Sequence, residues 1–202
     1  MKFNYIAIDG VIGAGKTTLA KMLAQTYNGT NLLEEVEENP FLADFYSDPK
    51  RYAFPTQLFF LLSRYRQQQK VIQQDLFQNI LIADYIFAKD KIFAYLNLED
   101  RELFLYEKIV VLLERDIVTP ELVIYLKSSP ERLMQNIRKR ARTFESDISY
   151  DYIKALNRAY NHFFNHYNKS LLLTINAAEI DFVCNGSDFE KINQKILDVT
   201  CY

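Results

Sequence analysis

A glycine-rich segment near the start of the chain combines residue types that bind phosphate. It follows the apolar run 5–8 and consists of Gly10, Val11, Ile12, Gly13, Ala14, Gly15, Lys16, Thr17 and Thr18. In such a loop, glycines let backbone N–H groups turn towards phosphate oxygens, the lysine reaches the β- and γ-phosphates, and the threonine hydroxyl can bind Mg²⁺. A helix predicted over 18–27 directs the positive end of its dipole at the same anion. The segment therefore predicts an ATP site, with Lys16 acting in catalysis and Thr17 binding the metal.

Carboxylates lie at or near the ends of three apolar runs that read as strands. These are Asp9 in the first run, Glu34 and Glu35 in the second, and Asp84 in the third. In a parallel sheet, the carboxyl ends of the strands meet at one edge, where ligands bind. A strand-end carboxylate reaches an acceptor hydroxyl better than one on a helix surface, which favours Glu34 as a general base. We expect Asp84 to bind Mg²⁺ together with Thr17.

A basic segment follows the helix that is predicted to begin near Ser129. It contains Arg138, Arg140 and Arg142. A basic run is usually a solvated surface. In a chain with a phosphate-binding loop, however, it predicts a lid that closes over ATP and neutralises charge during phosphoryl transfer. We expect Arg138 and Arg140 to bind ATP, and Arg140 and Arg142 to act on the transferred group.

Short apolar runs alternate with longer helical segments along the chain. The predicted strands cover residues 3–9, 32–36, 80–84, 122–126 and 171–175. Continuously apolar strands between helices are typical of a parallel sheet that is covered on both faces. The pattern predicts an α/β P-loop kinase fold: a central five-stranded parallel sheet flanked by helices, with the arginine-rich segment as a lid.

The composition predicts a single domain over residues 1–202. Hydrophobic residues make up 49% of the chain, and no Pro/Gly/Ser-rich linker divides it. The formal net charge of -2 argues against binding nucleic acid, because sequence-independent affinity needs many Lys and Arg at phosphates. Neither a signal segment nor a membrane-spanning run is found, so a cytoplasmic protein is expected. Cys184 and Cys201 are expected to be free thiols, and His162 and His166, which lack a third ligand, to be surface or packing residues.

Several spacings together resemble those of the deoxynucleoside kinases. Glu34 is followed by Val36 after one residue, and Tyr46 lies eleven residues before Gln57, which lies seven before Arg64. The basic segment Arg140-Ala141-Arg142 with Glu145 completes the pattern. The resemblance extends from about Phe3 to Tyr167. The amino-acid sequence of residues 34–40 and 48–57 is most similar to that of the bacterial deoxyadenosine/deoxyguanosine kinase branch.

The resemblance implies a role for each matching residue. Glu34 corresponds to the general base, and Tyr46 and Glu145 correspond to the groups that hold the sugar 3'-hydroxyl. Gln57 matches the amide that pairs with the nucleobase, and Arg64 matches an arginine on the base side. Because an amide offers a donor and an acceptor together, it suits a base edge that presents both.

The resemblance also implies the reaction and the assembly. The reaction is the ATP-dependent phosphorylation of the 5'-hydroxyl of a deoxyribonucleoside, preferably a purine, with Mg²⁺ as cofactor. Arg140 and Arg142 match the lid pair, and a homodimer is expected through the long helical segments 52–74 and 101–113. Candidates for enclosing the base are Phe41, Phe54, Phe59 and Phe60.

One place departs from the family pattern. After the third strand the family usually carries an acid followed by arginine, whereas this chain has Asp84 followed by Tyr85. Lys89, Lys91 or Arg64 could supply the missing cation. Whether Asp90 or Lys89 stands at the family's base-recognising aspartate is open, and Asp90 is taken as a candidate substrate-binding residue.

Two alternative functions share the fold and the loop. A thymidylate-like nucleoside monophosphate kinase needs an arginine for the acceptor phosphate, which Arg64 or Arg66 could supply. Glu34 argues against it, because a carboxylate would repel that phosphate. The second alternative is a nucleotide-binding protein with weakened transfer activity, which the missing arginine would favour.

Overall fold

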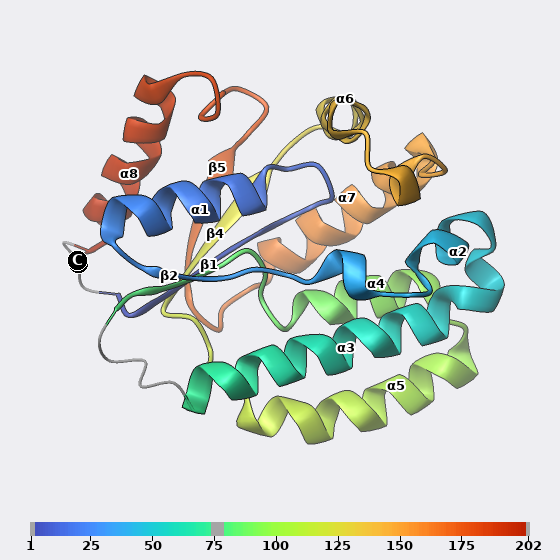
Figure 1. Cartoon of the computed structure of the whole chain (residues 1–202). Coiled ribbons are helices and arrows are strands. Elements are labelled where there is room, and N and C mark those ends of the chain that lie inside the picture. The colour runs from blue at the N-terminus through green and yellow to red at the C-terminus, as the bar shows by residue number, and fades with distance from the viewer. Residues whose placement is uncertain (1–2, 74–78, 201–202) are drawn as a thin grey trace.

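The computed structural model describes residues 3–73 and 79–200 and contains one five-stranded sheet (Figure 1). The strands are β1 (Tyr5–Gly10), β2 (Thr30–Leu32), β3 (Leu81–Ala83), β4 (Leu122–Lys127) and β5 (Leu171–Asn176). All neighbours pair in parallel, in the order β2-β3-β1-β4-β5. The prediction of a central five-stranded parallel sheet is therefore confirmed.

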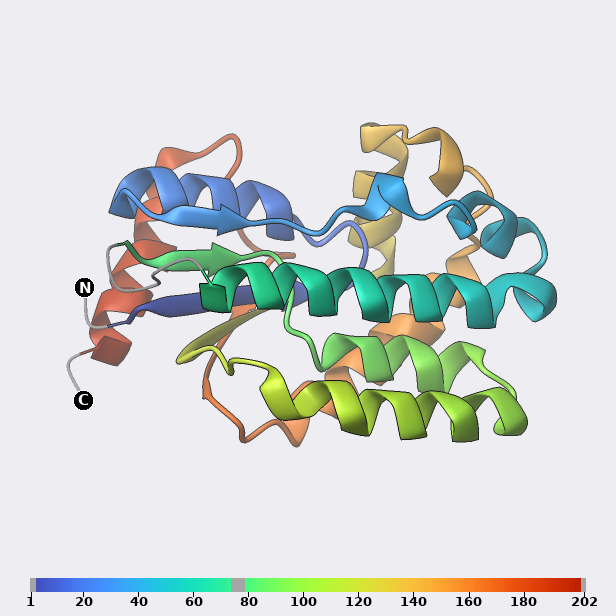
Figure 2. The same cartoon turned by 60° about the horizontal axis from the view of Figure 1, so that its bottom comes forward.

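Helices connect the strands and cover both faces of the sheet. They are α1 (Lys16–Tyr27), α2 (Leu42–Ser47), α3 (Pro49–Gln73), α4 (Lys89–Asn97), α5 (Asp100–Leu113), α6 (Pro130–Arg140), α7 (Tyr150–Asn165) and α8 (Gly186–Thr200). Single 3-10 turns cover Val36–Glu38, Glu114–Asp116 and Thr143–Glu145. Figures 1 and 2 show α1 and α8 on one side of the sheet and α3, α4 and α5 on the other.

The core consists of continuously apolar strands between these two helical layers. Every residue of β1 is buried, and so are the first five residues of β4. Ile6, Ile8 and Ile124 are fully inaccessible to solvent. Because parallel strands are covered on both faces, their sequences do not alternate with polar residues, and this absence of alternation made both strands recognisable.

Two helices begin after a serine that caps them, and the first of them starts near Ser129, as the sequence predicted. The side chain of Ser129 accepts a hydrogen bond from the Arg132 N–H at the start of α6, and the next residue is Pro130. The Ser149 side chain likewise accepts a hydrogen bond from the Tyr152 N–H at the start of α7. A serine that accepts from the third helical N–H, and a proline in the first turn, both stabilise a helix start.

The predicted position of the second strand was wrong. The strand ends at Leu32, whereas the prediction placed it over 32–36. Beyond Leu32, the N–H of Glu34 donates to the side chain of Asp84 at 2.8 Å instead of joining the β3 ladder. The chain leaves the sheet here, and Glu34 lies two residues beyond the strand.

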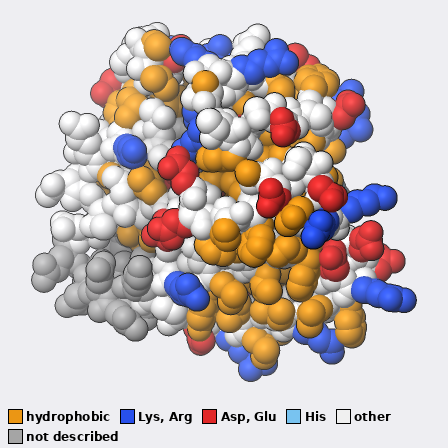
Figure 3. All heavy atoms as spheres, turned by 45° about the vertical axis from the view of Figure 1, so that its right-hand side comes forward, with side chains coloured by type: hydrophobic (Ala, Val, Ile, Leu, Met, Phe, Trp, Pro, Cys, Tyr) orange, Lys and Arg blue, Asp and Glu red, His pale blue; other side chains and the backbone are white. Residues whose placement is uncertain are grey.

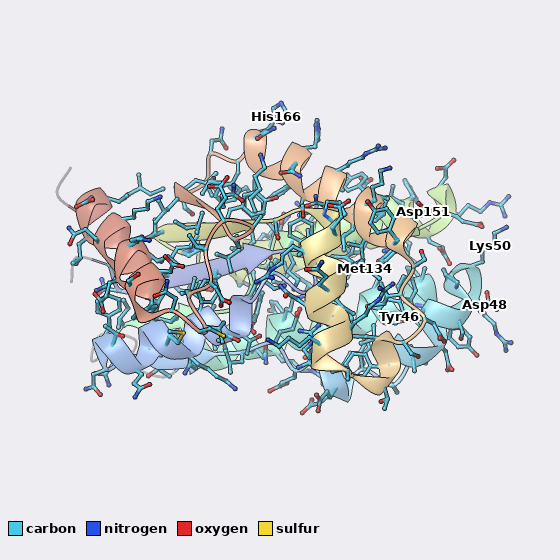
Figure 4. All side chains as sticks on the ribbon, turned by 90° about the horizontal axis from the view of Figure 1, so that it is seen from above. Tyr46, Asp48, Lys50, Met134, Asp151 and His166 are labelled. Atoms are coloured by element: carbon cyan, nitrogen blue, oxygen red, sulfur yellow. The ribbon has the colours of Figure 1, made fainter. Side chains whose placement is uncertain are left out.

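The remaining sequence expectations concern residues outside the sheet. Among the described helices, none is long and apolar enough to cross a membrane. Cys184 is exposed, and Cys201 lies outside the described residues. His166 Nδ1 donates a 2.8 Å hydrogen bond to the carbonyl oxygen of His162, and His166 projects from the end of α7 at the periphery (Figure 4). The described residues contain no cluster of three metal-binding side chains.

Candidate active site

The glycine-rich segment forms a tight loop between β1 and α1. Gly13 and Gly15 have φ values of 86° and 94°, which L side chains rarely adopt. A Cβ on Gly13 would also lie 2.7 Å from the backbone oxygen of Leu133 in α6. A second contact joins Gly13 to α6, because Asn136 Nδ2 donates a hydrogen bond to the backbone oxygen of Gly13 at 2.8 Å. The loop is therefore closely packed against the helix that leads into the arginine-rich segment.

Lys16 opens α1 and points back into the loop. Its Nζ donates to the carbonyl of Val11 at 3.1 Å. Burial lowers the pKa of Lys16 to about 8, and the nearby charge of Lys89 adds to the effect. An incoming phosphate would supply the negative charge that this buried ammonium lacks.

Asp84 connects the phosphate loop to the acidic segment. Its Oδ2 accepts a hydrogen bond from the hydroxyl of Thr17, and its Oδ1 accepts one from the N–H of Glu34. A hydroxyl and a carboxylate beside a phosphate loop fit Mg²⁺, which binds proteins through one or two oxygen ligands and completes its shell with phosphates and water. The placement of Thr17 and Asp84 is thus compatible with their predicted role.

Asp9 and Glu35 do not share this role. Asp9 is fully buried and accepts hydrogen bonds from the N–H groups of Gly10 and Ile86, at 2.6 and 3.2 Å. Burial raises the pKa of Asp9, and these contacts tie the loop to the segment after β3. Glu35 is exposed. Neither of them lines the cavity, so they do not join Glu34 and Asp84 at the ligand-binding edge as the strand ends suggested.

Glu34 lies in a buried cluster of opposite charges. Arg64 donates to its Oε1 from Nε at 2.8 Å and from Nη2 at 2.6 Å, while Lys89 Nζ donates to its Oε2 at 2.7 Å. Burial alone would raise the pKa of Glu34, but Lys89 and Arg64 outweigh it and hold the pKa well below its usual range. Glu34 is consequently ionised at neutral pH and can accept hydrogen bonds.

Arg64 also pairs with Asp90, which lies deeper in the protein. Asp90 is completely buried, forms an ion pair with Arg64 Nη1 and accepts a 2.9 Å hydrogen bond from the Tyr106 hydroxyl. Gln57, two turns before Arg64 on α3, donates from Nε2 to the backbone oxygen of Asp90 at 2.8 Å. The carboxylate of Asp90 thus lies behind Arg64, and its influence on a ligand passes through that guanidinium.

The arginine-rich segment reaches the site through Glu145. Arg140 donates to the two Glu145 oxygens at 2.5 and 3.2 Å, and Glu145 is buried. Arg142 lies between carboxylates, 3.9 Å from Glu145 and 3.8 Å from Glu37. Arg138, which was predicted to bind ATP, is exposed and does not line the cavity.

These groups surround one cavity of about 280 Å³ at the carboxyl ends of the strands. Among its lining residues are these predicted site residues: Ile12, Gly13, Lys16, Thr17, Glu34, Tyr46, Gln57, Arg64, Asp84, Arg140, Arg142 and Glu145. Residues from six separate segments of the sequence therefore converge on one space. Figure 4 shows Tyr46 turned inward, while Asp48 and Lys50 from the next turn point outward.

The aromatic wall was predicted only in part. Of the four candidate phenylalanines, Phe60 lines the cavity, while Phe41, Phe54 and Phe59 do not. The sequence analysis missed five further aromatic residues of the lining, namely Phe45, Phe93, Phe144, Tyr152 and Tyr160, and the amide of Asn97. Part of the signal was present in the sequence, because Lys89, Phe93 and Asn97 are spaced by four and share one helix face.

The structure reduces the number of side chains that could replace the arginine missing after Asp84. Lys91 Nζ pairs with Glu114 at 2.7 Å and does not line the cavity, so this candidate was wrong. Lys89 and Arg64 both line the cavity and both contact Glu34. Arg66, considered for an acceptor phosphate, is exposed and does not line it.

The phosphate loop, the parallel sheet and the polar cavity at its carboxyl edge define a P-loop phosphotransferase. A family model described as deoxynucleoside kinase matches residues 6–201. The chain belongs to the deoxynucleoside kinase family, whose members phosphorylate the 5'-hydroxyl of deoxyribonucleosides, and the predicted family and enzyme class are confirmed.

Individual relatives agree with this assignment. Deoxyguanosine kinase from Bacillus subtilis (strain 168) is 39% identical over 193 residues, covering 93% of both chains. Deoxyadenosine kinase from Dictyostelium discoideum is 38% identical and covers 87% of this chain and 73% of its own. The structure of deoxyadenosine kinase from M. mycoides with the products dCMP and a flexible dCDP bound has a TM-score of 0.84 at 26% identity, and covers 96% of this chain and 99% of its own.

Proposed function

We propose that this enzyme transfers the γ-phosphoryl group of MgATP to the 5'-hydroxyl of a purine deoxynucleoside. The observation that carries the proposal is the position of Glu34, an ionised carboxylate between the phosphate loop and the Gln57 and Arg64 face of α3. An acceptor whose base contacts α3 would present its hydroxyl to Glu34, beside the phosphates. The relatives that are named for deoxyguanosine and deoxyadenosine support the purine preference.

The donor side of the cavity binds ATP in this proposal. The loop N–H groups and Lys16 hold the phosphates, with Ile12 and Gly13 on the cavity wall. Thr17 and Asp84 would hold Mg²⁺, which neutralises charge on the phosphates when bound. A solved structure of M. mycoides deoxyadenosine kinase with bound dATP supports the binding of a nucleoside triphosphate by a protein of this fold.

The acceptor side holds the nucleoside by its sugar and its base. Tyr46 and Glu145 bind the 3'-hydroxyl, and Gln57 binds the base edge. One N–H of the Gln57 amide donates to the backbone oxygen of Asp90. The amide oxygen and the second N–H are then available for the nucleobase. Asp90 fixes the guanidinium of Arg64 from behind.

The transfer step needs a proton acceptor and mobile cations. Glu34 accepts the proton of the 5'-hydroxyl as the oxygen attacks phosphorus, and the bond to the leaving ADP oxygen breaks. Arg140 and Arg142 leave the Glu145 carboxylate and pair instead with the negative charge of the transferred phosphoryl group. A lid of this type also excludes water during transfer.

The proposed function is tested by measuring ADP release with MgATP and each of the four deoxynucleosides and their 5'-monophosphates. We expect turnover with deoxyguanosine and deoxyadenosine, because unpaired polar groups on Gln57 and Arg64 disfavour a mismatched base strongly. The Lys16→Ala variant serves as the control for contaminating kinase. Best turnover with thymidine would contradict the purine preference, turnover with monophosphates alone would favour the thymidylate-like alternative, and no turnover at all would favour the nucleotide-binding alternative.

We also propose that two copies form a homodimer through α5 and the neighbouring part of α3. Phe104, Val111 and Leu112 on α5 are 55–63% exposed, and Leu62 on α3 is also exposed. Figure 3 shows hydrophobic side chains gathered over the part of the surface where these helices lie. Patches of this kind commonly mark protein interfaces.

The dimer is tested by sedimentation velocity. We expect the wild type to sediment as two copies and a Phe104→Glu, Leu112→Glu variant to sediment as one, because two carboxylates cannot be buried unpaired in an apolar contact. Val183→Glu is the matched control, since Val183 is 61% exposed and lies on neither helix. A monomeric wild type would refute the dimer.

A further inference from the structure

Lys89 is a buried cation in the wall of the cavity. It is the first residue of α4, and its side chain is 4% exposed. Its Nζ lies 2.7 Å from Glu34 Oε2 and 6.0 Å from the centre of the Phe93 ring. A buried ammonium is costly unless a charge is paired with it, so the identity of its partner is informative.

The partners of the two cations around Glu34 differ. Arg64 has two carboxylates, Glu34 and Asp90. For Lys89, Glu34 is the carboxylate found within ion-pair distance among the described residues. Each cation also has its own oxygen of Glu34, since Arg64 occupies Oε1 and Lys89 occupies Oε2. If Glu34 lost its charge, Arg64 would keep its ion pair with Asp90, whereas Lys89 would have no carboxylate within ion-pair distance among the described residues. Asp9 would then be a more distant negative charge, near enough for Lys89 to lower its pKa.

Glu34 loses that charge in the proposed reaction. The proton of the acceptor hydroxyl moves to a Glu34 oxygen, a bond forms between the acceptor oxygen and phosphorus, and the leaving ADP oxygen takes the electrons of the broken bond. Negative charge thus leaves the carboxylate and accumulates on the new phosphate ester. Lys16 on the loop and Lys89 on α4 lie on the same cavity wall and are close enough for the charge of Lys89 to affect the pKa of Lys16.

We propose that Lys89 is a catalytic residue of the transfer: it holds Oε2 of Glu34 towards the acceptor hydroxyl, and it pairs with the phosphoryl group as Glu34 is neutralised. This inference rests on the proposed function. In it, Lys89 supplies the positive charge of the arginine that the family usually carries directly after the acid corresponding to Asp84. Tyr85 occupies that position, and its hydroxyl donates to Gln67 Oε1 at 2.8 Å, away from the cavity. The ammonium arrives instead from the start of α4.

The inference predicts a defect in turnover that depends on charge. Lys89→Met keeps the length and the apolar stem but removes the cation, and we expect kcat to fall roughly 10²-fold, as for loss of one charge-stabilising donor. Lys89→Gln keeps a hydrogen-bond donor without charge and should be equally slow. Lys89→Arg restores the cation and should recover at least about tenfold of the loss. The KM for MgATP should change less than kcat in every variant, because Lys89 acts on the phosphoryl group during its transfer and not on bound MgATP.

Lys91→Met is the matched control. Lys91 lies two residues further along α4, pairs with Glu114 outside the cavity and should keep its wild-type kcat when replaced. Urea unfolding and MgATP binding of each variant show whether it is folded. A wild-type kcat in Lys89→Met or Lys89→Gln, or an equal loss in Lys89→Arg, would overturn the inference. Wild-type turnover on deoxynucleosides would leave the proposed function standing in either case, whereas its absence would refute both.

Discussion

Replacing Glu34 by Gln is expected to lower kcat roughly 10²- to 10⁴-fold, the usual contribution of a positioned general base. Gln has the same shape but cannot accept the hydroxyl proton. The fold should persist with reduced stability, because Arg64 keeps its ion pair with Asp90 while Lys89 loses its ion pair with Glu34. MgATP binding should also persist, since the loop that holds the phosphates is a separate segment. Initial rates at saturating substrates and a titration with MgATP measure the two quantities.

Glu35→Gln is the control for the Glu34 variant. Glu35 is adjacent and chemically identical, but it is exposed and does not line the cavity. Its replacement should leave kcat within about twofold of the wild type, which corresponds to the half kcal/mol expected for a surface change. Unchanged turnover in Glu34→Gln would exclude Glu34 as the base. Equal losses in both variants would show that the whole segment has moved.

Replacing Arg64 by Met should lower the free energy of unfolding by roughly 3–5 kcal/mol, the cost of breaking a buried ion pair from one side. Arg64 is 3% exposed and pairs with both Glu34 and Asp90. Without it, Asp90 stays fully buried with the Tyr106 hydroxyl as a polar contact and no cation. Urea unfolding of the purified protein measures the change.

Two further variants make the Arg64 prediction specific. Arg66→Met removes an exposed guanidinium from the same helix and should change the unfolding free energy by no more than about 0.5 kcal/mol. Asp90→Asn combined with Arg64→Met should recover part of the loss, because no unpaired charge remains at residue 90. Additive losses in the double variant would show that the two residues do not interact energetically.

Much of the fold could be predicted because its signals are local. The continuous apolar character of β1 and β4 and the serines before α6 and α7 depend on neighbouring residues alone. The end of β2 could not be predicted, because the Asp84 side chain takes the N–H of Glu34 from 50 residues away. A side chain that replaces a strand partner leaves no periodic trace in the sequence.

The part of the candidate site that could be predicted is the part whose residues have a recognisable spacing in the sequence. The predicted Lys16, Glu34, Gln57 and Arg64 all line one cavity. The pairing of Lys89 with Glu34 was not predictable, because it depends on how far α4 is rotated against α3. Asp9 was misplaced for a related reason: a strand-end carboxylate can point either to the ligand or into the loop backbone, and strand position alone does not distinguish the two.

Gln57 and Arg64 differ in how freely they can be replaced without loss of stability. Gln57 donates to a backbone carbonyl, so a substitution there leaves no buried charge without a partner. Arg64 serves two carboxylates and cannot change alone without a large loss of stability. A substitution in this wall of the cavity is therefore expected to cost less stability at residue 57 than at residue 64.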